Sequence, residues 1–341
     1  MMRLMKRRIL KERGSLYPFL FMGCWNKEGS ARDAVLDAIS EDPVPLLVLG
    51  GDNAYPEKMA KKKEFILGDI MKGLDGLPKD KLIYVGIGNH NVDEHPVTNT
   101  TDSIFNVESN YPHWELPYKY YCVIFEEDRQ SLVFLDTNLT SSHSEFKKML
   151  NWLHKTLTFL EKYDYQYYVV QHEPFFSIKP PKSGKSGVRI TGLDNAEDIL
   201  DLLYDYPPIA ILSADTHNYQ EWDLNYDGQV FRQIVVGTGG ASPDPVPSLQ
   251  DLRYNTEFYE DDDIEGTHLI KGTPFSSITY KTDELNAEQS LGYGYYRIMG
   301  EGQGIFRRVR RWGGGFTRKK TQQRKQTKQT KQTKQVTRKR A

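Results

Sequence analysis

The chain has few cysteines and no long hydrophobic run. Its 341 residues include two cysteines, Cys24 and Cys122, so a disulfide framework is not expected. No apolar run approaches the roughly 20 residues that a helix needs to cross a bilayer. The basic start, MMRLMKRRILKERG, lacks the apolar core of a secretory signal peptide. These absences predict an intracellular protein, cytoplasmic or nuclear, with free thiols, no signal peptide and no transmembrane segment.

Acidic residues are nearly absent from both ends of the chain. Residues 307–341 contain 15 Lys/Arg and no Asp or Glu, and residues 1–13 contain six Lys/Arg and one Glu. The rest of the chain therefore holds 24 basic and 45 acidic residues, although the whole chain has a formal net charge of −1. We expect an acidic central domain at 16–311, a basic N-terminal segment at 1–15 and a basic tail at 312–341.

The tail lacks the apolar residues that a folded core requires. After GGG at 313–315 it repeats Lys-Gln-Thr, a low-complexity pattern that predicts a disordered, polybasic segment. Its positive charge suits nonspecific binding to nucleic acid or to another anionic surface. A nuclear-localisation patch, a tether to anionic lipid and a solvated tail that offsets the acidic domain are the alternatives.

Short apolar runs alternate with segments of helical spacing along the central domain. Strands are predicted at 16–23, 45–50, 81–88, 165–172, 208–215, 219–236, 275–280 and 292–299, with a hairpin around Asp128-Arg129. Helices are predicted at 30–39, 58–72, 142–163 and 194–203. An acidic loop is expected at 257–266. The alternation predicts an α/β fold with a largely parallel core.

Polar side chains follow four of these apolar strands. They are Asp52-Asn53 with Tyr55, Asn89-His90, His172, and Asp215 with His217. Each alone is ordinary for a turn, but four strand ends carrying Asp, Asn or His predict a metal site. Ligands of open α/β sheets bind outside the carboxyl ends of the strands, where these residues would meet.

The motifs resemble those of the calcineurin-like metallophosphoesterases, which place Gly-Asp, Gly-Asn-His, a lone His and Gly-His-x-His at successive strand ends. The matching stretches, within 16–299, are GGDN (50–53), GNHN (88–91), His172 and DTH (215–217). GDNAY (51–55), DTHNYQ (215–220) and VVGTGGASPD (235–244) also resemble motifs of the purple acid phosphatases. The resemblance implies a four-layer αββα sandwich with a two-metal site between its sheets.

The resemblance also implies a role for each motif residue. The implied metal ligands are Asp52, Asn89, His172, Asp215, His217, Tyr55 and Cys24. The implied catalytic acid is His90, and the implied substrate-binding residues are Asn26, Asn53 and Asn91. The cofactor would be one or two ions, divalent or mixed-valence, of Mn, Fe or Zn.

Two positions depart from the family pattern. Cys24 stands where the family has an Asp in its first motif, and Asp215 replaces the first His of His-x-His. Cys24 is either a thiolate ligand, which would favour Zn²⁺, or a buried apolar thiol. Tyr55 is either a ferric ligand or a packing residue.

The implied activity is hydrolysis of phosphate mono- or diesters by a metal-bound hydroxide. The alternative is a catalytically weak or inactive protein of the same fold, which binds nucleic acid or another polyanion through its basic tail. A nuclease is a third interpretation.

Overall fold

The computed structural model describes most of the domain that the sequence predicts. The described residues are 8–55, 73, 75, 77, 81–91, 111, 113–139, 144–179, 189–244, 258–260, 267–270, 273–280, 293–300 and 302–309. The predicted helix at 58–72 and the basic tail lie outside these residues. The division into 1–15, 16–311 and 312–341 stays a prediction.

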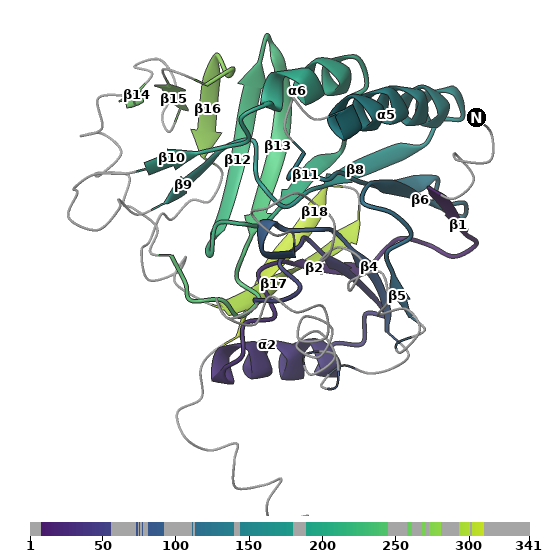
Figure 1. The fold of residues 1–341 in the computed structure, drawn as a ribbon, viewed down its shortest axis with the longest axis vertical. Helices are drawn as coiled ribbons and strands as arrows, with labels where there is room; N and C mark the ends of the chain where they lie inside the picture. Colours follow the sequence, from purple (N-terminus) through teal and green to yellow (C-terminus); the bar gives the residue numbers. More distant parts are fainter. Residues whose placement is uncertain are drawn as a thin grey trace, which may run out of the picture. The chain divides into compact units, whose positions relative to one another are not determined.

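A six-stranded sheet forms one half of the core (Figure 1). Its strands, in spatial order, are β18 (Gln303–Val309), β17 (Tyr293–Gly300), β2 (Phe19–Met22), β3 (Leu46–Leu49), β4 (Leu82–Val85) and β5 (Trp114–Glu115). β2 to β5 are parallel, and β17 and β18 add an antiparallel edge. All four residues of β3 are buried, as expected for a parallel strand that is covered on both faces.

A ten-stranded sheet forms the other half. Its order is β1 (Ile9–Glu12), β6 (Tyr121–Phe125), β7 (Gln130–Phe134), β8 (Gln166–Val170), β11 (Ala210–Ser213), β13 (Gln229–Val236), β12 (Tyr219–Tyr226), β16 (Ser277–Tyr280), β15 (Thr267–Ile270) and β14 (Phe258–Glu260). β7, β8, β11 and β13 form its parallel centre. A separate antiparallel pair joins β9 (Ser177–Lys179) to β10 (Arg189–Thr191).

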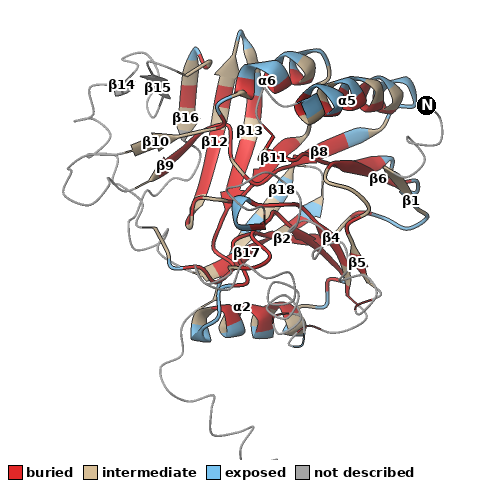
Figure 2. Ribbon diagram, in the orientation of Figure 1, coloured by how far each residue is buried: buried red, intermediate tan, exposed pale blue. Residues whose placement is uncertain are grey.

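Helices cover the outer face of each sheet. α2 (Ser30–Glu41) lies below the six-stranded sheet, and α5 (Ser144–Lys162) and α6 (Ala196–Asp205) lie on the ten-stranded sheet (Figure 1). The buried side of each helix faces its sheet, and the exposed side faces solvent (Figure 2). The order is helix, sheet, sheet, helix, so the predicted four-layer αββα sandwich is confirmed.

Strand periodicity separates the two apolar cores. In β6, Tyr121 and Val123 belong to the core between the sheets, whereas Cys122 and Ile124 belong to the core under α5 and α6. The buried Tyr121 hydroxyl also bonds across the sheets: it accepts from Val85 N at 2.9 Å and donates to Val85 O at 3.0 Å. These two hydrogen bonds and the shared core fix the position of one sheet relative to the other, and hence the position of their strand ends.

Seven of the described strands lie where the sequence predicted none: β1, β5, β9, β10, β14, β15 and β18. β1, within the basic N-terminal segment, pairs in parallel with β6. It is anchored by the Arg8 guanidinium, which lies 3.8 Å from the Tyr118 ring centroid and 4.4 Å from that of Tyr120. β14 occupies part of the predicted acidic loop, because Phe258 pairs with Ile270 of β15 there. The remaining residues of that loop lie outside the described residues.

Candidate metal centre

Three strand ends take an unusual backbone conformation where the two sheets meet. Cys24 after β2, Asp52 after β3 and Asp215 after β11 have φ values of 52°, 54° and 51°. Residues other than glycine adopt this left-handed region at a cost of about 1–3 kcal/mol, and such strain concentrates at functional sites. This conformation directs the side chains of Cys24, Asp52 and Asp215 to one place at the ends of their strands.

Two glycines permit the close approach of these turns. A Cβ on Gly88 would lie 2.3 Å from both the backbone nitrogen and Oδ1 of Asp52. A Cβ on Gly51, whose φ is +101°, would lie 2.6 Å from Nδ1 of His172. The loops after β3, β4 and β8 therefore touch at positions where no side chain fits.

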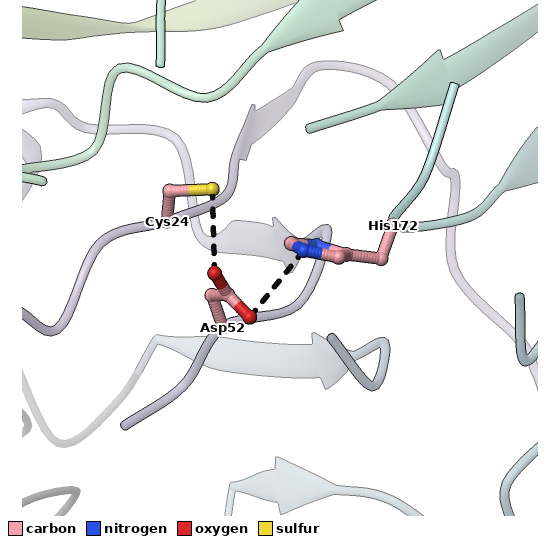
Figure 3. A group of neighbouring side chains, drawn as sticks. All are labelled: Cys24, Asp52 and His172. Atoms are coloured by element: carbon pink, nitrogen blue, oxygen red, sulfur yellow. Dashed lines mark hydrogen bonds and ion pairs between the residues drawn. The ribbon is translucent and has the colours of Figure 1, made fainter. Parts of the chain in front are cut away.

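Cys24, Asp52 and His172 form a buried cluster at this junction. Sγ of Cys24 lies 3.8 Å from Oδ2 of Asp52, and Nε2 of His172 lies 3.3 Å from Oδ1. One potential ligand atom from each residue lies within 4.8 Å of the others. Figure 3 shows the sulfur and the imidazole directed toward the Asp52 carboxylate. The exposed fraction of each residue is 1% or less.

The hydrogen bonds of His172 fix its tautomer. Nδ1 lies 2.8 Å from the carbonyl oxygen of Gly50, which can only accept, so Nδ1 carries the proton. Nε2 is buried, faces Asp52, and has no hydrogen-bond partner among the described residues. A backbone carbonyl bound to the far nitrogen is the usual arrangement behind a metal-ligating histidine.

The spacing of the ligand atoms is compatible with one bound divalent ion. Tetrahedral bonds of about 2.0 Å to N or O and about 2.3 Å to S place N and O ligands about 3.3 Å apart and S and O ligands about 3.5 Å apart. The observed separations of 3.3 Å and 3.8 Å are close to these values. Three protein ligands leave a fourth position open, as catalytic zinc sites do.

The thiol of Cys24 needs a cation in order to ionise. Burial, followed by the charges of Asp52 and Asp215, raises the pKa of Cys24 well above its ordinary value. A thiol in this setting is neutral by itself and becomes a thiolate only when a bound ion offsets its charge.

Asp215 is already paired with a cation from the protein. Oδ2 of Asp215 accepts a hydrogen bond from the Lys179 ammonium, and Oδ1 lies 3.9 Å from Nε2 of His172. Burial acts to raise the pKa of Asp215, but His172 and Lys179 outweigh it and hold that pKa below its ordinary value. The negative charge of Asp215 is therefore already offset by side chains of the protein.

His217 and Tyr55 lie beside the cluster. Nδ1 of His217 donates to the carbonyl of Ser242 at 2.9 Å, and burial lowers the pKa of this imidazole, so its neutral form is favoured. Tyr55 packs against Cys24, Ala214 and Ala241. Burial, followed by the neighbouring Cys24 and Asp52, raises the pKa of the Tyr55 phenol, which disfavours the phenolate that a ferric ion binds.

The loop after β4 contributes its backbone to the cluster. His90, in the short helix η1 (Asn89–Asn91), donates its backbone N–H to Oδ1 of Asp52 at 3.0 Å. The side chains of Asn89 and His90 are exposed, and the ring centroid of His90 lies 4.6 Å from that of Tyr55. The metal-ligand role of Asn89 and the acid role of His90 stay predictions.

The three asparagines predicted to contact substrate form a buried amide network. Oδ1 of Asn91 accepts from the backbone nitrogens of Asn53 and Gly88, and Nδ2 of Asn53 donates to Gly86 O. Nδ2 of Asn26 donates to Asn53 O at 2.8 Å. These bonds tie the loops after β2, β3 and β4 together behind the cluster. Substrate contact by these amides stays a prediction.

Two polar residues at the centre were absent from the predicted set. Lys179 follows no strand end of the parallel core and belongs to no motif, so the sequence offered no signal for it. Glu173 adjoins the predicted ligand His172, and this adjacency was a usable signal. Burial, followed by the charge of Asp215, raises the pKa of Glu173 to about 7. Glu173 can therefore hold or release a proton near neutral pH.

The layers and the strand-end site define a class of fold. The chain has the calcineurin-like metallophosphoesterase fold, which it shares with a purple acid phosphatase of known structure. No family model matches the chain, and no curated protein matches it in sequence. None of the described helices has the length and apolar character needed to span a bilayer.

Two solved structures show the likeness. One is described as "GAP50 the anchor in the inner membrane complex of Plasmodium": it has 16% identity and a TM-score of 0.50, and the match covers 87% of this chain and 90% of that one. The other is the purple acid phosphatase PPD1 from yellow lupin (Lupinus luteus) seeds, with 13% identity and a TM-score of 0.54. That match covers 87% of this chain and only 52% of the lupin chain.

Proposed function

We propose that the chain is a metal-dependent phosphoesterase that hydrolyses phosphate mono- or diesters. The observation that carries the proposal is the buried convergence of Cys24, Asp52 and His172 at the carboxyl ends of both sheets. A divalent ion held by these residues would lower the pKa of water and offset negative charge on the phosphoryl oxygens.

The chain's own residues would divide the remaining work. The Gly50 carbonyl keeps Nε2 of His172 directed at the cluster, and the His90 backbone N–H orients the Asp52 carboxylate. The exposed His90 imidazole is free to donate a proton to the leaving oxygen of the ester. The amide network of Asn26, Asn53 and Asn91 holds the loops in place during turnover.

A second candidate is a non-catalytic protein of this fold that acts by binding. The observation that favours it is the Lys179–Asp215 pair, which occupies a carboxylate that the resemblance assigns to a metal. One protein of similar structure is described as the anchor in the inner membrane complex of Plasmodium. The basic tail would then bind nucleic acid or another polyanion, with an affinity that falls steeply as salt rises.

Replacing His90 by alanine tests the proposed function. Turnover of an alkyl phosphate monoester or of a dialkyl phosphate diester, whose strongly basic alkoxide leaving groups need a proton, is expected to fall by about 10²–10⁴-fold, the usual contribution of a positioned proton donor. Bound metal should not change, because His90 offers Asp52 only its backbone. The matched control is His154→Ala, an exposed histidine on α5. A wild type that holds metal and turns over neither ester would favour the second candidate.

A further inference from the structure

A positively charged side chain lies against the cluster. The Lys179 ammonium contacts Oδ2 of Asp215, and the two side chains are only 13% and 19% exposed. The other oxygen of this carboxylate faces Nε2 of His172 at 3.9 Å. The cation therefore belongs to the same group of side chains as the candidate metal ligands, one carboxylate away from His172.

The position of Lys179 is built into the fold. Its strand, β9, is joined to the loop that carries Asp215 by a 2.7 Å hydrogen bond between the hydroxyls of Ser177 and Thr216. The next residue, Ile178, exchanges backbone bonds of 3.1 and 2.8 Å with the side-chain amide of Gln220 on β12. All these polar groups are buried. These bonds hold β9 so that the Lys179 ammonium lies beside Asp215. Most lysines, in contrast, are exposed on the surface.

We propose that Lys179 is a built-in cation that takes the place of a second metal ion, so that the centre binds one divalent ion. The inference rests on the proposed function, because it assumes that Cys24, Asp52 and His172 hold the first ion. The Lys179 ammonium already offsets the negative charge of Asp215, which is the charge that would attract a second ion. A further divalent ion at Asp215 would also be repelled by the Lys179 charge at short range.

The test is the amount of zinc bound by a set of charge variants. Each protein is equilibrated with zinc and desalted, and metal per chain is measured by plasma mass spectrometry and native mass spectrometry. The wild type is expected to hold about one ion. Lys179→Met is expected to hold about two, because the Asp215 carboxylate is then no longer neutralised by an ammonium and can bind a second ion. Lys179→Arg, which keeps the charge, should stay at about one.

A double variant links the second ion to its carboxylate. Lys179→Met with Asp215→Asn should return to about one ion, since the anionic ligand is then absent. The matched control is Lys147→Met, an exposed lysine on α5, which should behave as the wild type. Thermal unfolding of every variant checks that it is folded, and Lys179→Gln serves as the milder replacement.

The outcomes separate this inference from the proposed function. Two ions in the wild type would overturn the role of Lys179 and leave the metal centre intact, as would a single ion in folded Lys179→Met and Lys179→Gln. No ion in the wild type or in any variant would overturn the metal centre itself.

Discussion

Replacing His172 by alanine is expected to weaken zinc binding by about a hundredfold or more. Changes to groups that merely orient a ligand cost about 10–100-fold, and this substitution removes the ligand itself. The reason lies in the bond from Nδ1 to Gly50 O, which leaves Nε2 buried and without a partner among the described residues. The measurement is zinc affinity in competition with a chromogenic chelator, together with the thermal midpoint with and without zinc.

The thermal midpoint distinguishes a lost ligand from a damaged fold. Zinc should raise the midpoint of the wild type, since an ion that binds only the folded state stabilises it. It should have little effect on His172→Ala. The control, His154→Ala on α5, should respond to zinc as the wild type does. An unchanged zinc affinity in His172→Ala would contradict the assignment of this residue to the centre.

Gly88→Ala is expected to disrupt both the fold and the centre. The added Cβ would meet the backbone nitrogen and Oδ1 of Asp52 at 2.3 Å, and Cε1 of His172 at 2.9 Å. Overpacking of this kind costs about 1–3 kcal/mol, and backbone atoms cannot swing away as a flexible side chain can. The free energy of unfolding, from urea titration of the metal-free protein, should fall by about that amount, and zinc affinity should fall with it.

The control for this substitution is Gly14→Ala, which introduces the same methyl group where no atom lies within 4 Å. It should leave the unfolding free energy and zinc affinity near those of the wild type. Normal stability and zinc binding in Gly88→Ala would show that the loops after β3 and β4 do not approach each other as described.

The sequence predicted the parallel parts of the fold because those parts depend on local pattern. Fully buried strands such as β3 and β11 are continuous apolar runs, and each ends at a polar residue that can be recognised. The helix α5 followed from its regular apolar spacing. β1 was missed because its formation depends on pairing with β6, more than a hundred residues away, and on the packing of Arg8 against two tyrosine rings.

The sequence could predict only those residues of the centre that directly follow a strand. Asp52 follows β3 of the six-stranded sheet and His172 follows β8 of the ten-stranded sheet, so their convergence follows from the carboxyl ends of both sheets lying at the same end of the sandwich. The exposure of Asn89 and the burial of Asn91 could not be predicted, because the short helix η1 breaks the alternation of the preceding strand. Lys179 could not be predicted either, since its approach to Asp215 depends on bonds from Ser177 and Gln220 across the fold.

The identity of the residue at position 24 sets the character of the centre. An Asp there would supply a hard oxygen ligand, whereas Cys24, in the proposed centre, would supply sulfur, which favours zinc. Its burial beside Asp52 keeps the thiol protonated until an ion binds, so metal uptake should release a proton.

X-ray absorption at the zinc edge, on the wild-type chain loaded with zinc and desalted, identifies the atoms bound to the ion. We expect about one ion per chain, with one sulfur neighbour at about 2.3 Å and nitrogen or oxygen neighbours at about 2.0 Å. A coordination shell that contains no sulfur, or a chain that retains no zinc, would contradict the assignment of Cys24, Asp52 and His172 as the metal centre.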